Sequence, residues 1–573
     1  MSTPTQRTVD HDLKLVAPIA SAVSLLFFLY YFQRGEILLY GDAVAHINIA
    51  RRVFDSQTPG LLQLGTVWLP LPHLLMIPFL VSDKMWQSGV GGSIPSMIAY
   101  VFGVIGLFRF TRSMLEDDDR TRKSARSGAW LAALVYGVNP NLIYLQTTAM
   151  TESLYLTLFI WAAVYLAEFL RSMRHSTPAL MDKTASGRPH YRCAACLAGA
   201  ELTRYDGWLL AGVIGTTVLF ILLRRWSDHT FRRVALKFLV AIAAAPLLWL
   251  AYNAAVYGNP LEFANGPYSA KAIEQRTAQP GYPAHPGAGN VVTATSFFLK
   301  AAQLNMAEGN WGRLWIAIAL AGSFLAMKIR AGRAVLLVWV PVVFYAFSIA
   351  YGGVPLFLPA WWPFTWYNLR YGLQLLPLFA VSAAMIASAV PAIAAPEGTI
   401  EKRRLAPSLK RWLNTNLLVR GTCAAGLVFI ALSYSLVWKA QPLCFKEAWV
   451  NSRTKLALET SVAKAVSALP ASSTYLMYVG DHVGVFQQAG VPLRQVINEG
   501  NHRPWKKPAD SEGLWEQALA DPLRHVDFVI TYDGDATDQA VEKRNLTLLT
   551  EVHTRDQPRA RIYAARAALK QSR

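Results

Sequence analysis

Long apolar segments recur along this chain and constrain its fold more than any other feature. Hydrophobic residues make up 53% of the 573 residues and charged residues only 16%, whereas soluble domains carry about 25% charged residues. Most apolar segments approach the roughly 20 residues that a helix needs to cross a bilayer. The composition therefore predicts a mainly α-helical, polytopic membrane protein. The clearest segments are 14–32, 93–111, 128–147, 153–170, 208–223, 234–256, 312–327, 334–351, 371–394 and 416–438.

Two further apolar segments are ambiguous, and the lysines and arginines decide between the alternatives. Segment 67–81 contains prolines at positions 70, 72 and 78, and segment 193–203 is short and rich in small residues. If 67–81 is a re-entrant or interfacial helix and 193–203 crosses, every short basic loop lies on the side of the N-terminus, as the positive-inside rule requires. We therefore expect about eleven spans, a cytoplasmic N-terminus and an extracytoplasmic C-terminus. These basic loops are 112–126, 171–192, 224–233, 328–333 and 397–411.

The net charge of +19 does not indicate a nucleic-acid-binding protein. The basic residues lie in short clusters between apolar segments, and no basic stripe or known nucleic-acid motif accompanies them. Cys193 and Cys196 form a CAAC motif within an alanine-rich apolar stretch. A redox or zinc role needs an accessible thiolate and further ligands, so we expect these cysteines to pack inside a helix.

The hydropathy pattern divides the chain into two domains. Residues 1–444 hold the spans, and the long apolar segments stop near residue 445. We therefore expect a transmembrane domain at 1–444 and a small extracytoplasmic α/β domain at 445–573. Two long loops lie on the outer side, namely 33–92, with interfacial helices, and 257–311. Strand-like runs in the second domain are 474–479, 527–532, 546–552 and 560–565.

The stretch YGDAVAHINIARRVF, residues 40–54, follows the first span and contains unusual polar residues for a membrane boundary. Asp42 and His46 are four residues apart, so they would share one face of a helix. Asp42 would alternatively be the N-cap of that helix, and Arg51 and Arg52 would alternatively contact lipid phosphates. A carboxylate at a helix start is rigidly aimed in either case, so Asp42 and His46 are candidate catalytic residues.

Other ionisable residues mark the same predicted outer boundary. Glu152, in AMTES, starts a helix, and Arg204 and Asp206, in TRYDGW, lie in a tight turn. Arg370, in NLRYG, begins a span with Tyr371 beside it. An arginine on the outer side opposes the positive-inside trend and suits a phosphate. The alternatives are a simple ion pair for Arg204 with Asp206, and a favoured first-turn acid for Glu152.

The two outer loops supply further candidates. His73 lies in the proline-rich run LPLPHLL, close to Trp68, which is a typical interfacial residue. Loop 257–311 is rich in Gly, Pro and Asn, and loops of this length are usually functional or disordered. His285 and Tyr268 are the candidate contacts in this loop.

In their order and common side, these motifs resemble those of the GT-C glycosyltransferases, in particular the protein O-mannosyltransferases and the aminoarabinose transferases of lipid A. The resemblance covers roughly residues 10–440. Two departures stand out. Relatives often have paired acids after the first span, where this chain reads GDA, and a Lys or His before the prolines, where it reads TVWLP. The motifs that carry the resemblance are GDA, ARR at 50–52, LPLPHLL, TES, TRYDG and NLRYGLQLLP.

The resemblance implies a GT-C fold and an enzyme that takes a hexose or pentose from a polyprenyl-phosphate carrier on the outer face. The acceptor would be a hydroxyl of a glycan, lipid or protein. Asp42 would act as general base, with inversion at the anomeric carbon. Arg204, Arg370 and Tyr371 would bind the donor phosphate. The residues that would contact the acceptor or support the site are Asp206, Arg51, His73 and Tyr268. Asp42, His46 and Glu152 would be the ligands if a divalent cation, Mg or Mn, is used; some relatives use none.

Other functions remain as alternatives. A ligase or polymerase would use a longer lipid-linked donor, and a transporter or a non-catalytic subunit would also be polytopic. Transporters usually place ionisable residues near the bilayer midplane and often show internal repeats, whereas here the charges lie at one face and no clear repeat is present. We expect a location in the plasma (inner) membrane of the cell envelope. The expected partners are the bilayer, the lipid-linked sugar and its acceptor, and not nucleic acid.

Overall fold

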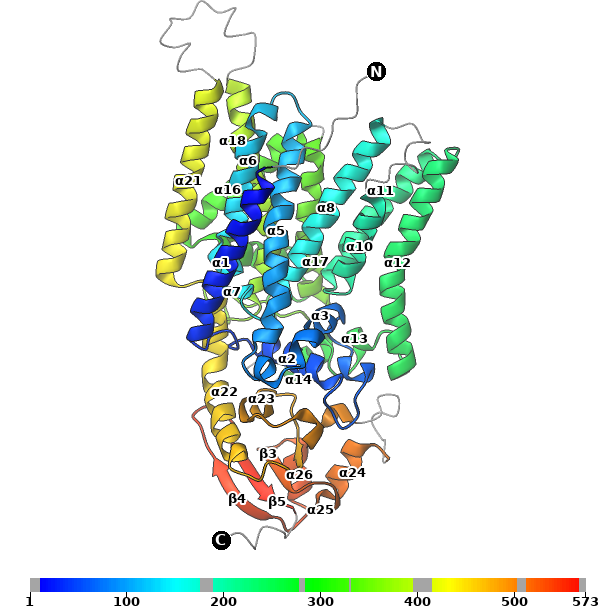
Figure 1. Ribbon diagram of the computed structural model, residues 1–573, viewed down its shortest axis with the longest axis vertical. Helices are drawn as coiled ribbons and strands as arrows, with labels where there is room; N and C mark the ends of the chain where they lie inside the picture. The colour runs from blue at the N-terminus through cyan, green and yellow to red at the C-terminus, as the bar shows by residue number, and fades with distance from the viewer. Residues whose placement is uncertain are drawn as a thin grey trace, which may run out of the picture.

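The computed structural model describes residues 11–175, 189–277, 284–328, 331–394, 415–501 and 512–565. Long helices run roughly along the longest axis, and a small sheet lies at one end (Figure 1). Within these residues, eight segments are helical, long and apolar enough to cross a membrane. The prediction of a mainly helical, multi-pass membrane protein is confirmed. These segments contain α1 (Leu13–Gln33), α5 (Val90–Glu116), α8 (Glu152–His175), α11 (Asp206–Arg224), α12 (His229–Tyr257), α17 (Val340–Tyr351), α18 (Leu376–Ala394) and α21 (Thr415–Ala440).

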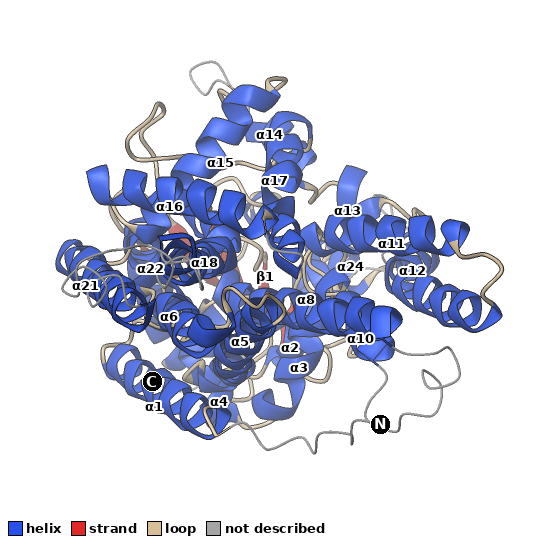
Figure 2. Ribbon diagram, turned by 90° about the horizontal axis from the view of Figure 1, so that it is seen from above, coloured by secondary structure: helices blue, strands red, loops and turns tan. Residues whose placement is uncertain are grey.

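The other three predicted spans are also helical and lie in the same bundle. They are α6 (Ala125–Gly137), α10 (Pro189–Glu201) and α16 (Gly309–Met327). Helix α6 packs on α5 and α18, α10 on α8 and α12, and α16 on α18. Seen along the long axis, α11 and α12 lie on one side of the bundle and α1 and α21 on the other (Figure 2). Cys193, in α10, is buried and its thiol contacts the carbonyl of Ala162, as expected for a packing residue.

The predicted continuous span 128–147 is wrong, because the helix is broken in its middle. Helix α6 ends at Gly137 and the short α7 (Pro140–Leu145) follows. The side chain of Asn139 caps α7 by accepting from the backbone N–H groups of Asn141 and Leu142. Pro140 fits the first position of a helix, where a missing N–H costs nothing. The asparagine–proline pair therefore starts a new helix that average hydropathy does not reveal.

The segment that we expected not to span is a short helix. Helix α3 (Leu71–Leu80) has 10 residues, which corresponds to roughly 15 Å, about half the hydrocarbon thickness. It packs on α2 (Gly41–Arg52) near the sheet end of the bundle (Figure 1). The predicted first outer loop also contains η1 (Leu61–Leu64) and α4 (Asp83–Gln87). The length of α3 is consistent with the prediction that 67–81 does not span, and its position relative to the membrane stays a prediction.

The second predicted loop, 257–311, contains more helix than its composition suggests. It forms α13 (Glu262–Asn265), α14 (Ala270–Thr277) and α15 (Val291–Met306). The side chain of Asn290 caps α15 by accepting from the backbone N–H of Thr293. Asn305, near the end of α15, donates to the carbonyl of Leu369 at 2.7 Å. Helix α15 thereby fixes the 3-10 helix η4 (Leu369–Leu375), which precedes α18.

Gly372 lets η4 approach α15 closely, and its substitution should destabilise this contact. A Cβ on Gly372 would lie 2.4 Å from the backbone carbon of Ala301, and neither backbone can shift cheaply. We expect Gly372→Ala to lower the melting temperature and the yield of folded protein, since overpacking a buried contact costs about 1–3 kcal/mol. The control is Gly421→Ala in α21, where a Cβ meets open space. Equal melting temperatures for the two variants would contradict this packing.

Segments predicted to lie on the outer side gather at one end of the molecule. Helices α2, α3, α13 and α14 and the sheet occupy the lower part of Figure 1, whereas the connections 112–126 and 224–233 lie at the opposite end. The predicted basic loop 397–411 lies outside the described residues, as do parts of 171–192 and 328–333. The predicted division of the described connections between two ends is therefore present in the fold.

Helix α22 (Leu443–Ser467) leads from the bundle into a small mixed sheet of order β2-β1-β3-β5-β4. Strand β1 is parallel to β2 and β3, and β5 is antiparallel to β3 and β4. The four predicted strand runs are strands, whereas the short β2 was not predicted. The strands are β1 (Tyr475–Met477), β2 (Val496–Ile497), β3 (Phe528–Tyr532), β4 (Thr547–Val552) and β5 (Ala560–Ala564), with α23 (Val485–Ala489), α24 (Leu514–Ala520), α25 (Pro522–His525) and α26 (Ala536–Val541) between them.

Helix α2 is held between the bundle and the C-terminal region. The Asn48 side chain donates to Gln487 Oε1 at 2.9 Å and accepts from Trp86 Nε1 at 3.1 Å. The carboxylate of Asp55 accepts from the backbone N–H groups of Leu493 and Arg494. These bonds are buried or partly buried, so they fix the direction in which α2 presents its first turn.

Candidate active site

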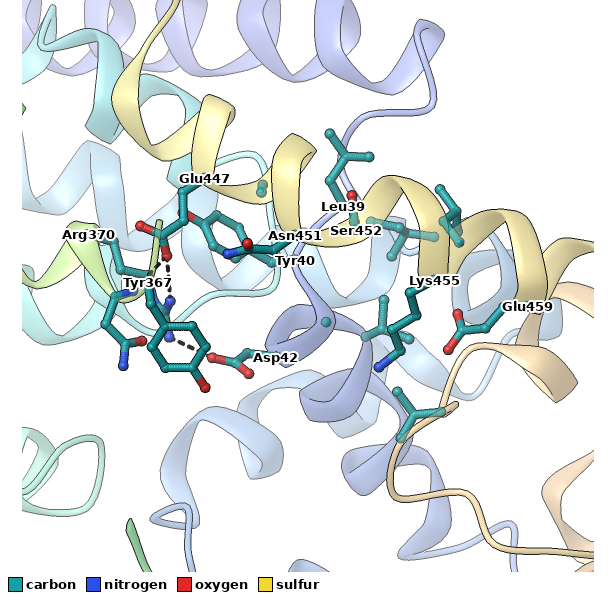
Figure 3. A pocket seen from close by; sticks show the side chains of 17 residues that line it. Leu39, Tyr40, Asp42, Tyr367, Arg370, Glu447, Asn451, Ser452, Lys455 and Glu459 are labelled. Atoms are coloured by element: carbon teal, nitrogen blue, oxygen red, sulfur yellow. Dashed lines mark hydrogen bonds and ion pairs between the residues drawn. The ribbon is translucent and has the colours of Figure 1, made fainter. Parts of the chain in front are cut away.

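Arg370 lies at the centre of a cluster of carboxylates and is only 6% exposed. Its Nη2 donates to Asp42 Oδ2 at 2.5 Å, its Nε to Glu152 Oε1 at 3.2 Å and its Nη1 to Glu447 Oε1 at 3.0 Å. Figure 3 shows its contacts with Asp42 and Glu447. The planar guanidinium can donate in several fixed directions at once. One arginine therefore joins three acids that are far apart in the sequence.

A second arginine completes the network. Arg204 Nη1 donates to Glu152 Oε1 at 3.2 Å, and its Nη2 donates to the hydroxyl of Tyr345 at 2.8 Å. Arg204 Nε also lies 3.3 Å from Asp206 Oδ1. Glu152 thus accepts from both arginines through one oxygen, and it is fully buried. The predicted pair Arg204 and Asp206 is real, but it belongs to a larger cluster.

Three of the acids reach this cluster because helix starts converge there. Asp42, Glu152 and Asp206 lie in the first turns of α2, α8 and α11. Carboxylates are stabilised at helix N-termini by the helix dipole and the free N–H groups. Asp42 is not the N-cap that we considered, because Tyr40 occupies that position and the Asp42 side chain binds Arg370 instead.

Glu447, in α22, is a site residue that the sequence analysis missed. It is 1% exposed and, besides Arg370, it accepts from the backbone N–H groups of Asn368 at 3.1 Å and Leu369 at 2.7 Å. Glu447 therefore ties the start of η4 to α22 and positions Arg370. A glutamate in a polar helix resembles a solvated residue, and no spacing pattern in the sequence links it to a segment 77 residues away.

Tyr371 lies beside both arginines. The guanidinium carbon of Arg204 is 5.0 Å from the Tyr371 ring centroid, and that of Arg370 is 5.1 Å from it. Such contacts are attractive, because the ring face is electronegative. Tyr371 thus helps to hold the two positively charged guanidinium groups of Arg204 and Arg370 in place. Carboxylates outnumber guanidinium groups in this site.

His46 and His73 form a buried pair beside the cluster. His46 Nδ1 lies 2.8 Å from His73 Nε2, and the His46 ring packs on Trp68. Burial, with a further contribution from the nearby Arg370 and Arg204, lowers the pKa of His46 to about 3. Burial likewise holds the pKa of His73 well below its usual range. Both imidazoles are therefore neutral at physiological pH, and one donates to the other.

Acidification should destabilise the protein through this pair. The unfolded state takes up a proton at His46 below about pH 6.5, whereas the folded state does so only near pH 3. Stability contributed by neutral His46 is therefore lost as the pH falls through that window, by about 1 kcal/mol between pH 7.5 and 5.5. We expect His46→Gln to reduce the fall in melting temperature over this range, and His525→Gln in the small domain not to. An unchanged fall in His46→Gln would contradict the neutral pair.

Two other predicted residues lie away from the cluster. Arg51 is buried and binds Asp55 at 2.7 Å, Asp83 at 2.5 Å and the carbonyl of Leu80 at 2.6 Å. It thereby links α2 to the end of α3 and the start of α4. Tyr268 lies between α13 and α14, is 36% exposed and does not line the pocket described next.

A pocket of about 180 Å³ opens beside Asp42 and Arg370. Asp42, Tyr367, Arg370 and Glu447 line one end. From there the pocket follows α22 toward Glu459, as Figure 3 shows. Asp42 is the exposed acid of the cluster, with 42% of its side chain accessible, compared with 0% for Glu152 and 1% for Glu447. Asp42 is therefore the carboxylate that a ligand can reach.

The predicted metal ligands do not converge. Asp42 and Glu152 each bind Arg370, and His46 binds His73. Across the described part of the chain, no group of three or more His, Cys, Asp or Glu side chains could hold a metal ion. The residues Asp42, His46 and Glu152 thus do not fit a divalent cation in this arrangement.

Comparisons with known proteins identify the fold. No protein-family model matches the chain, and no curated protein matches its sequence. ArnT from Cupriavidus metallidurans bound to undecaprenyl phosphate matches with a TM-score of 0.54 at 14% identity, over 99% of this chain and 100% of that chain. Its apo structure matches with a TM-score of 0.55 at 13% identity, over 97% and 98%. The chain shares the fold of these ArnT structures, a GT-C-like fold.

The GT-C fold extends over the C-terminal sheet as well as the helices, since the match covers nearly the whole of both chains. The resemblance inferred from the motifs is therefore confirmed for the fold. The archaeal oligosaccharyltransferase AglB from Archaeoglobus fulgidus, in complex with an inhibitory peptide and a dolichol-phosphate, also matches. Its TM-score is 0.47 at 12% identity, over 94% of this chain and 72% of that chain.

Proposed function

We propose that this protein transfers a sugar from a polyprenyl-phosphate-linked donor to a hydroxyl acceptor at the pocket beside Asp42. The arrangement that carries the proposal is an accessible carboxylate bound to a buried arginine at the convergence of helix starts. The GT-C fold supports it, and so does the presence of undecaprenyl phosphate in one ArnT structure with this fold. The distribution of basic loops supports an extracytoplasmic site in the plasma membrane.

The donor phosphate would bind Arg370 in place of Asp42. The Nε and Nη1 groups of Arg370 are held by the buried Glu152 and Glu447, whereas Nη2 faces the accessible Asp42. A phosphate oxygen at Nη2 would form a charge-assisted hydrogen bond and release Asp42 from its ion pair. Donor binding would thus prepare the base in the same step.

The released Asp42 would act as general base. It would take the proton of the acceptor hydroxyl, whose oxygen attacks the anomeric carbon opposite the phosphate. The bond between that carbon and the phosphate oxygen breaks, and the electron pair leaves with the polyprenyl phosphate. Negative charge grows on the phosphate during this step, so the fixed guanidinium of Arg370 stabilises the transition state. The product has the inverted anomeric configuration.

Other members of the cluster would position these two groups. Arg204 does not line the pocket and is bound to Glu152, Asp206 and Tyr345. It would act on the phosphate through its charge and through Glu152, and not by contact. The neutral His46–His73 pair would support the first turn of α2 without taking up a proton.

A donor-consumption assay tests the proposed function. The full chain in lipid nanodiscs is incubated with undecaprenyl-phosphate-linked hexoses, pentoses and aminopentoses and with a cell-envelope extract as acceptor. We expect release of undecaprenyl phosphate from at least one donor, together with transfer of its sugar. A parallel incubation offers lipid-linked oligosaccharides, and consumption of these alone would contradict the proposal in favour of a ligase. Absence of all consumption would overturn the transferase function and favour a transporter.

A further inference from the structure

The pocket beside Asp42 continues along one face of α22 beyond the cluster. Asn451, Ser452, Lys455 and Glu459 line this extension. Ser452, Lys455 and Glu459 are spaced at three to four residues, so they project from one side of the helix. Figure 3 shows Lys455 and Glu459 along α22 on the far side of Asp42 from Arg370. The proposed chemistry at Asp42 and Arg370 does not use these residues.

Two buried polar atoms in the extension lack partners. Ser452 is 9% exposed and Glu459 is 5% exposed. Neither Ser452 Oγ nor Glu459 Oε1 has a hydrogen-bond partner in the part of the chain that the structure describes. Buried polar groups are nearly always hydrogen-bonded, and leaving one unpaired costs about 1–3 kcal/mol. Both atoms are nearly inaccessible to solvent, and Glu459 Oε1 also lies 3.9 Å from His482 Nδ1, which is beyond hydrogen-bond distance. The residues that carry them line the pocket, so a side-chain rotation would let a ligand supply the missing bonds.

Other serines of the same helix show that Ser452 is unusual. Ser461 donates to the carbonyl of Ala457 at 2.9 Å, and Ser467 donates to that of Ala463 at 2.8 Å. This bond to the preceding turn is the ordinary way for a helical serine to satisfy its hydroxyl. Ser452 does not make it, although it is more buried than Ser461. Its hydroxyl is therefore unpaired in a residue that lines the pocket.

Beyond the Arg370 end, where the donor phosphate would bind, the charges of the pocket favour a neutral ligand over a second anion. Asp42, Glu447 and Glu459 supply three carboxylates, against the two cations Lys455 and Arg370. Arg370 is already bound to two of these acids. A sugar hydroxyl both donates and accepts, so one ring can donate to a carboxylate and accept from a lysine or serine. An anionic group would instead meet the unpaired oxygen of Glu459.

Lys455 connects the extension to the reacting end. A Cβ placed on Gly41 would lie 4.0 Å from Lys455 Nζ, and Gly41 directly precedes Asp42. A ligand held by Lys455 and Glu459 would thus lie next to the base. The pocket encloses about 180 Å³, less than the roughly 300–1,000 Å³ of sites for drug-sized ligands. It suits a single ring.

We propose that this extension is a carbohydrate subsite, in which Ser452, Lys455 and Glu459 hold a neutral sugar ring of a glycan acceptor with one hydroxyl directed at Asp42. The inference rests on the proposed transferase function and specifies the acceptor class as a glycan, rather than a protein or an anionic lipid. The hydrogen-bonding groups of α22 would select the glycan acceptor. This selection would be independent of how Arg370 binds the phosphate of the sugar donor.

Binding of soluble glycosides tests the subsite directly. The full chain in lipid nanodiscs is examined by saturation-transfer NMR with neutral methyl hexopyranosides and with hexose 6-phosphates. We expect a neutral glycoside to bind, and Ser452→Ala and Glu459→Gln each to weaken binding by about fivefold or more, as the loss of a hydrogen bond of about 1 kcal/mol implies. The matched control Ser461→Ala, on the same helix, should bind as the wild type does. Because Ser452→Ala is a small change, it keeps the test valid if Glu459→Gln fails to fold.

Undecaprenyl phosphate binding, measured on the same variants, separates this inference from the proposed function. We expect Ser452→Ala to leave that binding unchanged. If donor is consumed by the wild type but no neutral glycoside binds, or if only hexose phosphates bind, the subsite is overturned and the transferase function stands. If glycosides bind with the expected losses but no donor is consumed, the carbohydrate site stands and the transferase function falls.

Discussion

Asp42→Asn should abolish sugar transfer while leaving the protein folded. Asparagine keeps the size of the side chain and can still accept from Arg370, but it cannot take a proton from the acceptor hydroxyl. General-base catalysis typically contributes about 10²–10⁴-fold, so we expect the turnover of the lipid-linked donor with acceptor to fall by about that factor. The measurement is the initial rate of undecaprenyl phosphate release, with the melting temperature as the check on folding.

The matched control for this variant is Asp83→Asn. Asp83 also binds an arginine, Arg51, but its side chain is 65% exposed and lies outside the pocket. Exposed ion pairs contribute about 0–1 kcal/mol, so this variant should retain nearly normal turnover. Wild-type turnover in Asp42→Asn would show that Asp42 is not the base. Another group in contact with Arg370 would then have to take the proton.

Arg370→Met should destabilise the protein more than any other single change in the site. It leaves the buried Glu447 without the arginine that neutralises it, and it leaves Glu152 with Arg204 as its remaining arginine partner. Removing one partner of a buried ion pair costs about 3–5 kcal/mol, because the other charge stays buried. We expect a large fall in the melting temperature of the protein in nanodiscs. Arg494→Met, at an arginine whose side chain is 65% exposed, should cause little change.

A double variant separates stability from chemistry at Arg370. Adding Glu447→Gln to Arg370→Met removes one of the uncompensated charges, so the melting temperature should partly recover. Sugar transfer should not recover, because the guanidinium group that would contact the leaving phosphate is gone. Recovery of transfer together with stability would mean that Arg370 only supports the fold.

The candidate site was largely predictable because hydropathy fixed where each helix starts. Alternating spans bring Glu152, Asp206 and Arg370 to the same end as Asp42, and the structure joins all four through two arginines. The prediction of a non-spanning α3 followed from its prolines and from the distribution of basic loops. These inferences follow from the alternating direction of successive spans across a bilayer. This alternation places residues that are far apart in the sequence at the same end of the molecule.

The remaining features depend on contacts that hydropathy does not encode. Glu447 belongs to the site because its carboxylate accepts from the backbone N–H groups at the start of η4. The sequence of the polar helix that carries Glu447 does not indicate this contact. His46 was expected to face the same way as Asp42, but its partner is His73, 27 residues later. The break in span 128–147 could have been predicted from Asn139 and Pro140, since that pair commonly starts a helix.

The most direct test of the account is a cryo-EM structure of the protein in nanodiscs with undecaprenyl phosphate. The account predicts the lipid phosphate within hydrogen-bond distance of Arg370 Nη2, with Asp42 released from Arg370 and turned into the pocket. The buried contacts of Arg370 with Glu152 and Glu447 should be preserved. A phosphate bound elsewhere, with the ion pair between Asp42 and Arg370 intact, would contradict the central claim that donor binding frees the base.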